Sequence, residues 1–326
     1  MSDLYKRKDW IDALRALALL FVMIGHLIPT VDSFFIFTSP IKIPLFFAIS
    51  GYLFNTKNLN QQLFLKNLFF KIVIPWLILS GSIYLLVSFI KGYHYFLRSM
   101  YEILTGDILW FMPCFVVGKI IFFYSHKFTK NYWSYIISIS FCILGFILAQ
   151  KDALNIFMIN RALIAQIFLL IGVLIRKYEN LLLNRVYVII SLLVYLSLCA
   201  FCYLLFPNIR MDIHLNHYYN EMYTIIMIFV GCFFAFGIIR IVNRFPRYLL
   251  EVGKNTLLIY ILHSYIYSFF NYIQKTLFGT LYKNTIMVVA YVVITCAICL
   301  VISAFLNRFA PFVLGHSKRT TNKLIQ

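Results

Sequence analysis

Ten apolar runs, most of them about twenty residues long, occupy nearly the whole sequence and restrict the chain to one class of fold. Short breaks that are charged or rich in Pro and Asn separate the runs. Backbone amides inside a bilayer must be hydrogen-bonded within the chain, and such runs are typical of helices rather than of barrel strands with alternating polarity. The sequence therefore predicts an all-α integral membrane bundle with about ten transmembrane helices. We expect them near residues 11–29, 35–54, 68–90, 109–125, 133–149, 160–175, 185–206, 221–241, 256–274 and 286–306.

Composition supports a membrane protein with a single domain. Hydrophobic residues make up 62% of the 326 residues and charged residues only 12%, so the chain has more apolar surface than a soluble core of this size hides. We expect one polytopic membrane domain over residues 1–316 and a short basic cytoplasmic tail over residues 317–326. The first run ends without a cleavage site of the kind that follows a signal peptide, so it is expected to be a retained helix.

The distribution of charge predicts the topology. The net charge of +18 comes from Lys and Arg in short loops and not from one continuous basic face, which argues against a nucleic-acid partner. With the N-terminus inside, 19 of the 29 Lys and Arg residues fall on the cytoplasmic side and 8 on the outer side. The positive-inside rule therefore predicts that both termini are cytoplasmic. The seven cysteines lie within apolar runs without a nearby His to complete a metal site. We therefore expect these cysteines to be small buried hydrophobic residues, and we expect no metal.

The first run carries the densest set of polar residues, namely Asp12, Arg15 and His26. A charged residue inside a transmembrane helix costs about 2.5–3.5 kcal/mol on insertion scales, so each is a functional candidate. On a helix, Arg15 and His26 differ by about 20° after three turns and lie about 16 Å apart on one face. Asp12 lies one turn before Arg15 and is expected to pair with it. The alternative for His26 is a buried histidine that is hydrogen-bonded to a neighbouring helix. The alternative for Arg15 is an arginine whose side chain extends to the lipid headgroups.

The second run is interrupted by Pro40, Lys42 and Pro44. Prolines are tolerated within a membrane where neighbouring groups satisfy the freed backbone. The pattern is therefore typical of a broken helix that lines a cavity.

From Asp9 to His26, the sequence DWIDALRALALLFVMIGH resembles the opening of the acyltransferase family 3 membrane proteins. The family's Arg-x10-His motif falls on Arg15 and His26. The resemblance covers the whole membrane region and is closest to the branch of sugar O-acetylases and polysaccharide-modifying proteins of bacterial envelopes. Further segments match in order and spacing: IPLFFAISGYLF (43–54), a basic stretch that ends in Pro (66–75), LWFMPCF (109–115) and GKNTLLIYILH (253–263).

This resemblance implies a multi-pass enzyme of the bacterial cytoplasmic (inner) membrane. It would transfer an acyl group, usually acetyl from acetyl-CoA, to a hydroxyl of a surface polysaccharide, a lipopolysaccharide or a lipid-linked sugar precursor. His26 and Arg15 would be the catalytic residues, with His26 either as a general base or as the carrier of an acyl group. Both routes need a neutral imidazole, which burial favours. Acyl-CoA, the glycan acceptor and membrane lipid are the expected partners.

The acyl-CoA donor carries several negative charges at its nucleotide end, so its site needs cations near the inner surface. Arg15, Lys66 and Lys71 are placed for this role. The distance of about 16 Å from Arg15 to His26 is comparable to the reach of an extended pantetheine arm. Many relatives have arginines in place of the two lysines, and a lysine is a point charge, so looser phosphate recognition is expected. Ordinary positive-inside anchoring is the alternative for both lysines.

Five residues are further candidates for substrate binding: Ser50, Gly51, Trp110, Tyr260 and His263. Backbone N–H groups near the first two could stabilise an oxyanion, although Gly51 could equally serve close helix packing. Trp110 could stack on a sugar, but an interfacial aromatic belt is favoured. Tyr260 and His263 are expected to line a polar path. His214 and His217, in the longest outer loop, could contact the acceptor, but a solvated loop is favoured for both.

Two other functions compete with the enzyme. One is an exporter or flippase for a polysaccharide or lipid-linked sugar, which would often have repeated halves with matching broken helices, and no convincing internal repeat is present. The other is a non-catalytic subunit of a polysaccharide assembly complex, in which His26 could be replaced without loss. The alignment of Arg15 with His26 favours the enzyme.

Overall fold

The fold is helical throughout the described part of the chain, apart from one isolated bridge between Asp212 and His217. The structure is a computed structural model that describes residues 8–28, 33–55, 59–129, 132–206, 211–242, 244–279 and 284–315, without the side chains of Ile90 and Leu183. The predicted all-α class is confirmed. The predicted tail over residues 317–326 lies outside the described residues, and the cytoplasmic placement of both ends stays a prediction.

Eight helical segments of the described chain are long and apolar enough to cross a membrane. The expected runs near 109–125 and 256–274 also form helices, α7 (Phe111–Phe128) and α14 (Thr256–Phe278), but neither is among the eight. Polar side chains lower their hydropathy, for example Lys119 in α7 and Asn271 in α14. The eight segments are Asp9–Leu27, Ser33–Tyr52, Gln61–Phe89, Trp133–Gln150, Ile156–Lys177, Arg185–Leu205, Glu221–Val242 and Thr285–Phe309.

The chain divides into two compact units. Unit 1 consists of Met1–Phe54, Phe168–Ile213 and His217–Ala297. Unit 2 consists of Asn55–Ile167, His214–Asn216 and Ile298–Gln326. Helices α9 (Ile159–Lys177) and α15 (Thr285–Phe309) contribute one part to each unit.

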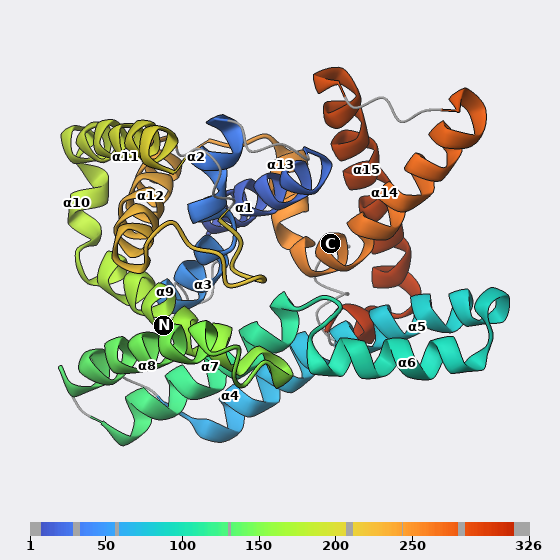
Figure 1. The fold of residues 1–326 in the computed structure, drawn as a ribbon, viewed down its shortest axis with the longest axis horizontal. Helices are drawn as coiled ribbons and strands as arrows, with labels where there is room; N and C mark the ends of the chain where they lie inside the picture. Colours follow the sequence, from blue (N-terminus) through green and yellow to red (C-terminus); the bar gives the residue numbers. More distant parts are fainter. Residues whose placement is uncertain are drawn as a thin grey trace. The chain divides into compact units, whose positions relative to one another are not determined.

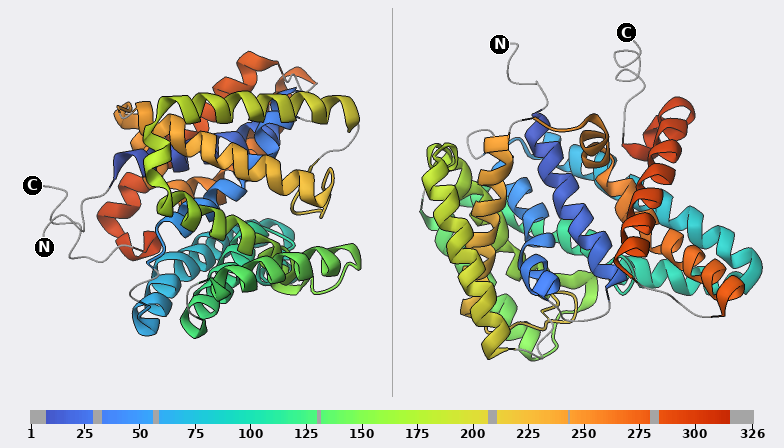
Figure 2. Two further views of the ribbon diagram at one scale, coloured as in Figure 1. Left: turned by 90° about the vertical axis from the view of Figure 1, so that its left-hand side faces the viewer. Right: turned by 90° about the horizontal axis from the view of Figure 1, so that it is seen from above.

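Unit 1 is built around α1 (Asp9–Leu27), of whose 19 residues 12 are buried. Helix α1 contacts α2 (Ser33–Lys42), α3 (Pro44–Tyr52), α12 (Glu221–Val242), α13 (Arg247–Lys254) and α14. Helices α10 (Glu179–Leu183) and α11 (Arg185–Leu205) pack on α12. The right-hand view of Figure 2 shows α11, α12 and α1 side by side. Most of α1 therefore lies among protein side chains, whereas Asp9 and His26 near its two ends are exposed.

The second span of unit 1 is interrupted, as the prolines predict. Helix α2 ends at Lys42, and α3 begins at Pro44 after the single connecting residue Ile43. Proline has no N–H, so Pro44 cannot donate the hydrogen bond to the preceding turn that would continue α2. It occupies instead the start of α3, where a missing N–H costs nothing.

Unit 2 contains a long helical segment in three parts: α4 (Gln61–Leu68), the π-helical turn η2 (Phe69–Val73) and α5 (Ile74–Lys91). Helix α6 (Tyr93–Thr105) runs back along α5, and Figure 1 shows the two side by side. Helix α8 (Trp133–Gln150) packs on α7. The turns η3 (Ile156–Met158) and η4 (Pro311–Leu314) contact α7 and α5 respectively. Helices α6, α10 and α13 were not predicted, because they are short or carry charges that break an apolar run.

Candidate active site

Two histidines from α1 and α14 meet in unit 1. The ring centroids of His26 and His263 lie 5.2 Å apart, with the ring planes at 44°. His26 is exposed at the end of α1, whereas His263 is only 1% exposed. One imidazole is thus reachable by a substrate while the other is held inside the protein. Sequence reasoning singled out both residues but did not predict that they are neighbours.

The buried ring of His263 has a defined orientation. Its Nδ1 atom lies 2.7 Å from the carbonyl oxygen of Tyr260 and 3.2 Å from that of Ile259. Its Nε2 atom lies 3.2 Å from the hydroxyl oxygen of Ser264. The rings of Tyr260 and Tyr267 pack against it, with centroids at 5.8 and 5.7 Å. Tyr260 is itself 8% exposed, so it encloses His263 and leaves little of its own surface for a substrate.

Arg15 and Asp12 form the expected ion pair near the start of α1. Arg15 Nη1 lies 3.3 Å from Asp12 Oδ1, and the Asp12 side chain is 1% exposed whereas that of Arg15 is 31% exposed. The buried carboxylate therefore orients a guanidinium that still reaches solvent or a ligand. This predicted pair is confirmed.

Helix α13 packs directly against this end of α1. A Cβ atom added to Gly253 would lie 1.8 Å from the carbonyl oxygen of Asp12, so the two backbones approach as only glycine allows. Lys254 follows Gly253 directly and lies 2.8 Å from Glu251 through Nζ and Oε1. The exposed Lys254 and Arg247 are thus carried by the helix that covers the Arg15 end of α1. The signal for this contact was Gly253 itself, the first residue of the GKNTLLIYILH segment.

The two lysines expected to bind the donor belong to unit 2. Lys66 lies in α4 and Lys71 in the π-helical turn η2, and both are exposed. The backbone of Lys71 packs against Gly315, which follows η4. Both side chains are therefore accessible to an anion.

Ser50 and Gly51 lie in the last turn of α3, where α9 crosses it. A Cβ atom on Gly51 would lie 1.9 Å from the carbonyl oxygen of Leu169, and one on Gly172 would lie 1.9 Å from that of Ala48. In the last turn of a helix the unbonded backbone groups are carbonyls and not N–H groups. The geometry therefore favours a role of Gly51 in close packing of α3 on α9 over a role of its backbone N–H in stabilising an oxyanion.

Trp110 is the N-cap residue of α7 in unit 2, and its ring stacks on that of His214 with centroids 5.3 Å apart and planes at 19°. Arg161, only 7% exposed, donates from Nε and Nη2 to the carbonyl oxygen of His214 at 3.2 and 2.7 Å. On its other side Arg161 donates from Nη1 to Asn160 Oδ1 at 2.8 Å and to Asn155 Oδ1. His214 is half-buried and not a fully solvated loop residue, because Arg161 bonds its carbonyl oxygen and its ring stacks on Trp110.

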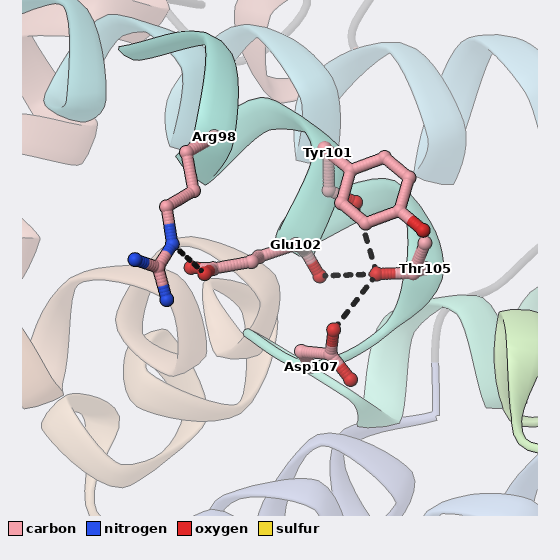
Figure 3. Close-up of polar contacts among 5 residues, drawn as sticks. All are labelled: Arg98, Tyr101, Glu102, Thr105 and Asp107. Carbon is pink, nitrogen blue, oxygen red and sulfur yellow. Dashed lines mark hydrogen bonds and ion pairs between the residues drawn. The ribbon is translucent and has the colours of Figure 1, made fainter. Parts of the chain in front are cut away.

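The segment that leads to Trp110 is held by the polar network in Figure 3. The Arg98 guanidinium lies 2.7 Å from Glu102 through Nε and Oε1. The Thr105 hydroxyl lies 3.0 Å from the carbonyl oxygen of Tyr101 and 3.1 Å from Asp107 Oδ2. These contacts close the end of α6 and orient the turn before Trp110.

Among the described residues, no group of three or more His, Cys, Asp and Glu side chains is arranged to hold a metal ion. All seven cysteines are free and six of them are buried, as expected for small hydrophobes.

A family model for the acyltransferase domain of acyltransferase family 3 matches residues 8–304. No curated protein and no solved structure matches the chain. The matched range contains the paired histidines, the Asp12–Arg15 pair, both exposed lysines and Trp110. The chain belongs to acyltransferase family 3 and is a membrane acyltransferase.

Proposed function

We propose that the chain is a multi-pass O-acyltransferase of the bacterial cytoplasmic membrane. It transfers an acetyl group from cytoplasmic acetyl-CoA to a hydroxyl of a surface polysaccharide, a lipopolysaccharide or a lipid-linked sugar precursor. The observation that carries this proposal is the pairing of exposed His26 with buried His263, on two segments that carry the family resemblance. An accessible imidazole supported by a second imidazole suits acyl transfer to a hydroxyl.

In the direct route, His26 acts as general base. It takes the proton of the acceptor hydroxyl while the oxygen attacks the thioester carbonyl carbon, and the C–S bond then breaks. The CoA thiolate leaves and receives the proton from the imidazolium, so the products are the O-acetyl ester and free CoA. In the alternative route, a nitrogen of His26 attacks the thioester carbonyl carbon, the C–S bond breaks and CoA leaves as the thiol with the proton that the imidazole loses. The acceptor hydroxyl then attacks the acyl-imidazole, takes the acetyl group and gives its proton to the imidazole that leaves.

The donor is expected to lie along α1 from Arg15 to His26. The two residues are about 16 Å apart along the helix axis, close to the length of the pantetheine arm. Asp12 fixes the guanidinium of Arg15, which can bind phosphate oxygens in bidentate fashion. Lys66 and Lys71, which the sequence predicts to bind the donor, are exposed point charges, so looser phosphate recognition is expected of them.

The acceptor is expected to contact the substrate-binding candidates. Trp110 is half-buried and its ring orientation is set by His214, which suits stacking on a sugar ring. Ser50 is half-buried and offers a hydroxyl, and Gly51 next to it keeps α3 close to α9. Tyr260 keeps His263 enclosed.

The test is the O-acetyl content of the surface glycan, measured by NMR in cells that lack the gene. The cells are complemented at equal expression with wild type, His26→Ala or the control His217→Ala, which alters an exposed loop histidine that is hydrogen-bonded to Asp212 through its backbone. We expect acetylation with wild type and with His217→Ala and none with His26→Ala. Equal acetylation by His26→Ala would favour a non-catalytic subunit. A loss of glycan export without a change in acetylation would favour the exporter.

A further inference from the structure

We infer that His263 is a positioning residue that selects the tautomer of His26 by accepting a hydrogen bond from it. The inference uses the proposed function only in assigning catalysis to His26. It rests on the hydrogen bonds of His263, on its burial and on the neighbouring ring.

The protonation pattern of His263 follows from its partners. The carbonyl oxygens of Tyr260 and Ile259 can only accept hydrogen bonds, and Nδ1 lies 2.7 and 3.2 Å from them. Nδ1 therefore carries the ring proton and donates it to the backbone of α14. In the neutral ring Nε2 then has a lone pair and can only accept. Helix α14 itself thus dictates that Nε2 is the nitrogen of His263 that accepts a hydrogen bond.

The ring that carries this acceptor lies next to the exposed imidazole. The centroid separation of 5.2 Å between His26 and His263 is within the range of rings in contact. If one N–H of His26 donates to Nε2 of His263, the other nitrogen of His26 has no proton and can take one from the acceptor hydroxyl. Which nitrogen of a histidine is protonated is set by the hydrogen bond that the other one makes. The Ser264 hydroxyl, 3.2 Å from the same Nε2, can donate to it when His26 turns away.

A neutral hydrogen-bond acceptor also suits the position of His263 within the membrane. A carboxylate in place of His263 would orient His26 in the same way but would bring a charge into the membrane, which costs about 2.5–3.5 kcal/mol on insertion scales. A buried neutral imidazole orients its neighbour without this cost. It also stabilises the imidazolium that forms on His26 when the proton is taken up.

The experiment is NMR of protein in lipid nanodiscs with ¹⁵N-labelled histidine, because imidazole nitrogen shifts distinguish the two tautomers. The chain has seven histidines, which single substitutions assign. The variants are His263→Phe, which keeps a ring but has no acceptor, and His263→Gln, whose amide oxygen can accept. Ser268→Ala, five residues further along α14, is the control. All variants are checked for folding by size-exclusion chromatography.

We expect His26 to occupy one tautomer in wild type and Ser268→Ala, a mixture in His263→Phe, and mainly the wild-type tautomer in His263→Gln. In the acyl-transfer assay, kcat should fall by about 10- to 100-fold in His263→Phe with little change in KM for acetyl-CoA, and His263→Gln should recover part of it. An unchanged tautomer ratio in His263→Phe would overturn the inference. If wild type has the single tautomer but transfers no acyl group, the positioning role stands and the proposed function fails.

Discussion

Gly253→Ala is expected to weaken the contact between α1 and α13. The new Cβ would lie 1.8 Å from the carbonyl oxygen, 2.5 Å from the carbonyl carbon and 2.9 Å from the Cα of Asp12. All three are backbone atoms that cannot turn aside, so α13 must retreat by about 1.6 Å to reach ordinary contact at 3.4 Å. Overpacking of this kind costs up to about 3 kcal/mol, and the better helix propensity of alanine returns about 1 kcal/mol. The expected net loss is about 2 kcal/mol.

The matched control is Gly81→Ala, in the interior of α5. Its nearest neighbour there would be Met100 Sδ at 3.7 Å, which is ordinary contact with a flexible side chain. Helix propensity alone should then stabilise the protein by about 1 kcal/mol. The two substitutions make the same chemical change and differ only in the space that receives it. They should therefore shift stability in opposite directions.

The assay is thermal unfolding followed by a thiol-reactive fluorophore, because six of the seven free cysteines are buried and react only on unfolding. At about 2 °C per kcal/mol for a chain of this size, Gly253→Ala should lower Tm by about 4 °C and Gly81→Ala should raise it by about 2 °C. Equal shifts of the same sign would refute the close backbone contact between α1 and α13.

Three further predictions concern single cations. Arg15→Gln should raise KM for acetyl-CoA by about 10-fold or more, since a charged hydrogen bond contributes about 1.5–3 kcal/mol, but should not change KM for S-acetyl-pantetheine, which lacks the nucleotide. Equal effects on both donors would contradict phosphate binding by Arg15. Lys66→Arg should lower KM for acetyl-CoA, because a guanidinium binds phosphate in bidentate fashion, and an unchanged KM would favour the anchoring alternative. Arg161→Gln should lower Tm far more than Arg98→Gln, because Arg161 is 7% exposed and bonded on two sides whereas the Arg98 side chain is 79% exposed. Similar losses would argue against the buried network.

Features that depend on local sequence were predictable. The long apolar runs predicted the helices, because in a bilayer composition alone selects this structure. Asp12 and Arg15 were expected to pair because residues three apart on a helix are neighbours. The interruption at Pro44 followed from the missing proline N–H. Each of these rests on residues within a few turns of one another.

Features that depend on packing between distant segments were not predictable from one sequence. The meeting of His26 with His263 requires α14 to lie on α1, which neither run specifies by itself. His214 was expected to be solvated because it lies in a polar loop, and its contact with Trp110 depends on the buried Arg161. Helix α13 escaped detection because it is short and charged, although its glycine indicated a close approach.

One stretch of chain, from Gly253 to His263, contacts α1 at both of its chemically important ends. Gly253 touches Asp12 beside Arg15, and His263 lies beside His26, about 21 Å further along α1. A retreat of α13 at Gly253 must therefore also disturb the start of α14, which carries His263. Gly253→Ala should lower kcat as well as raise KM for acetyl-CoA, whereas Arg15→Gln should change KM almost alone. Steady-state kinetics of the two variants separates these outcomes, and an unchanged kcat in Gly253→Ala would mean that the two ends of α1 are held independently.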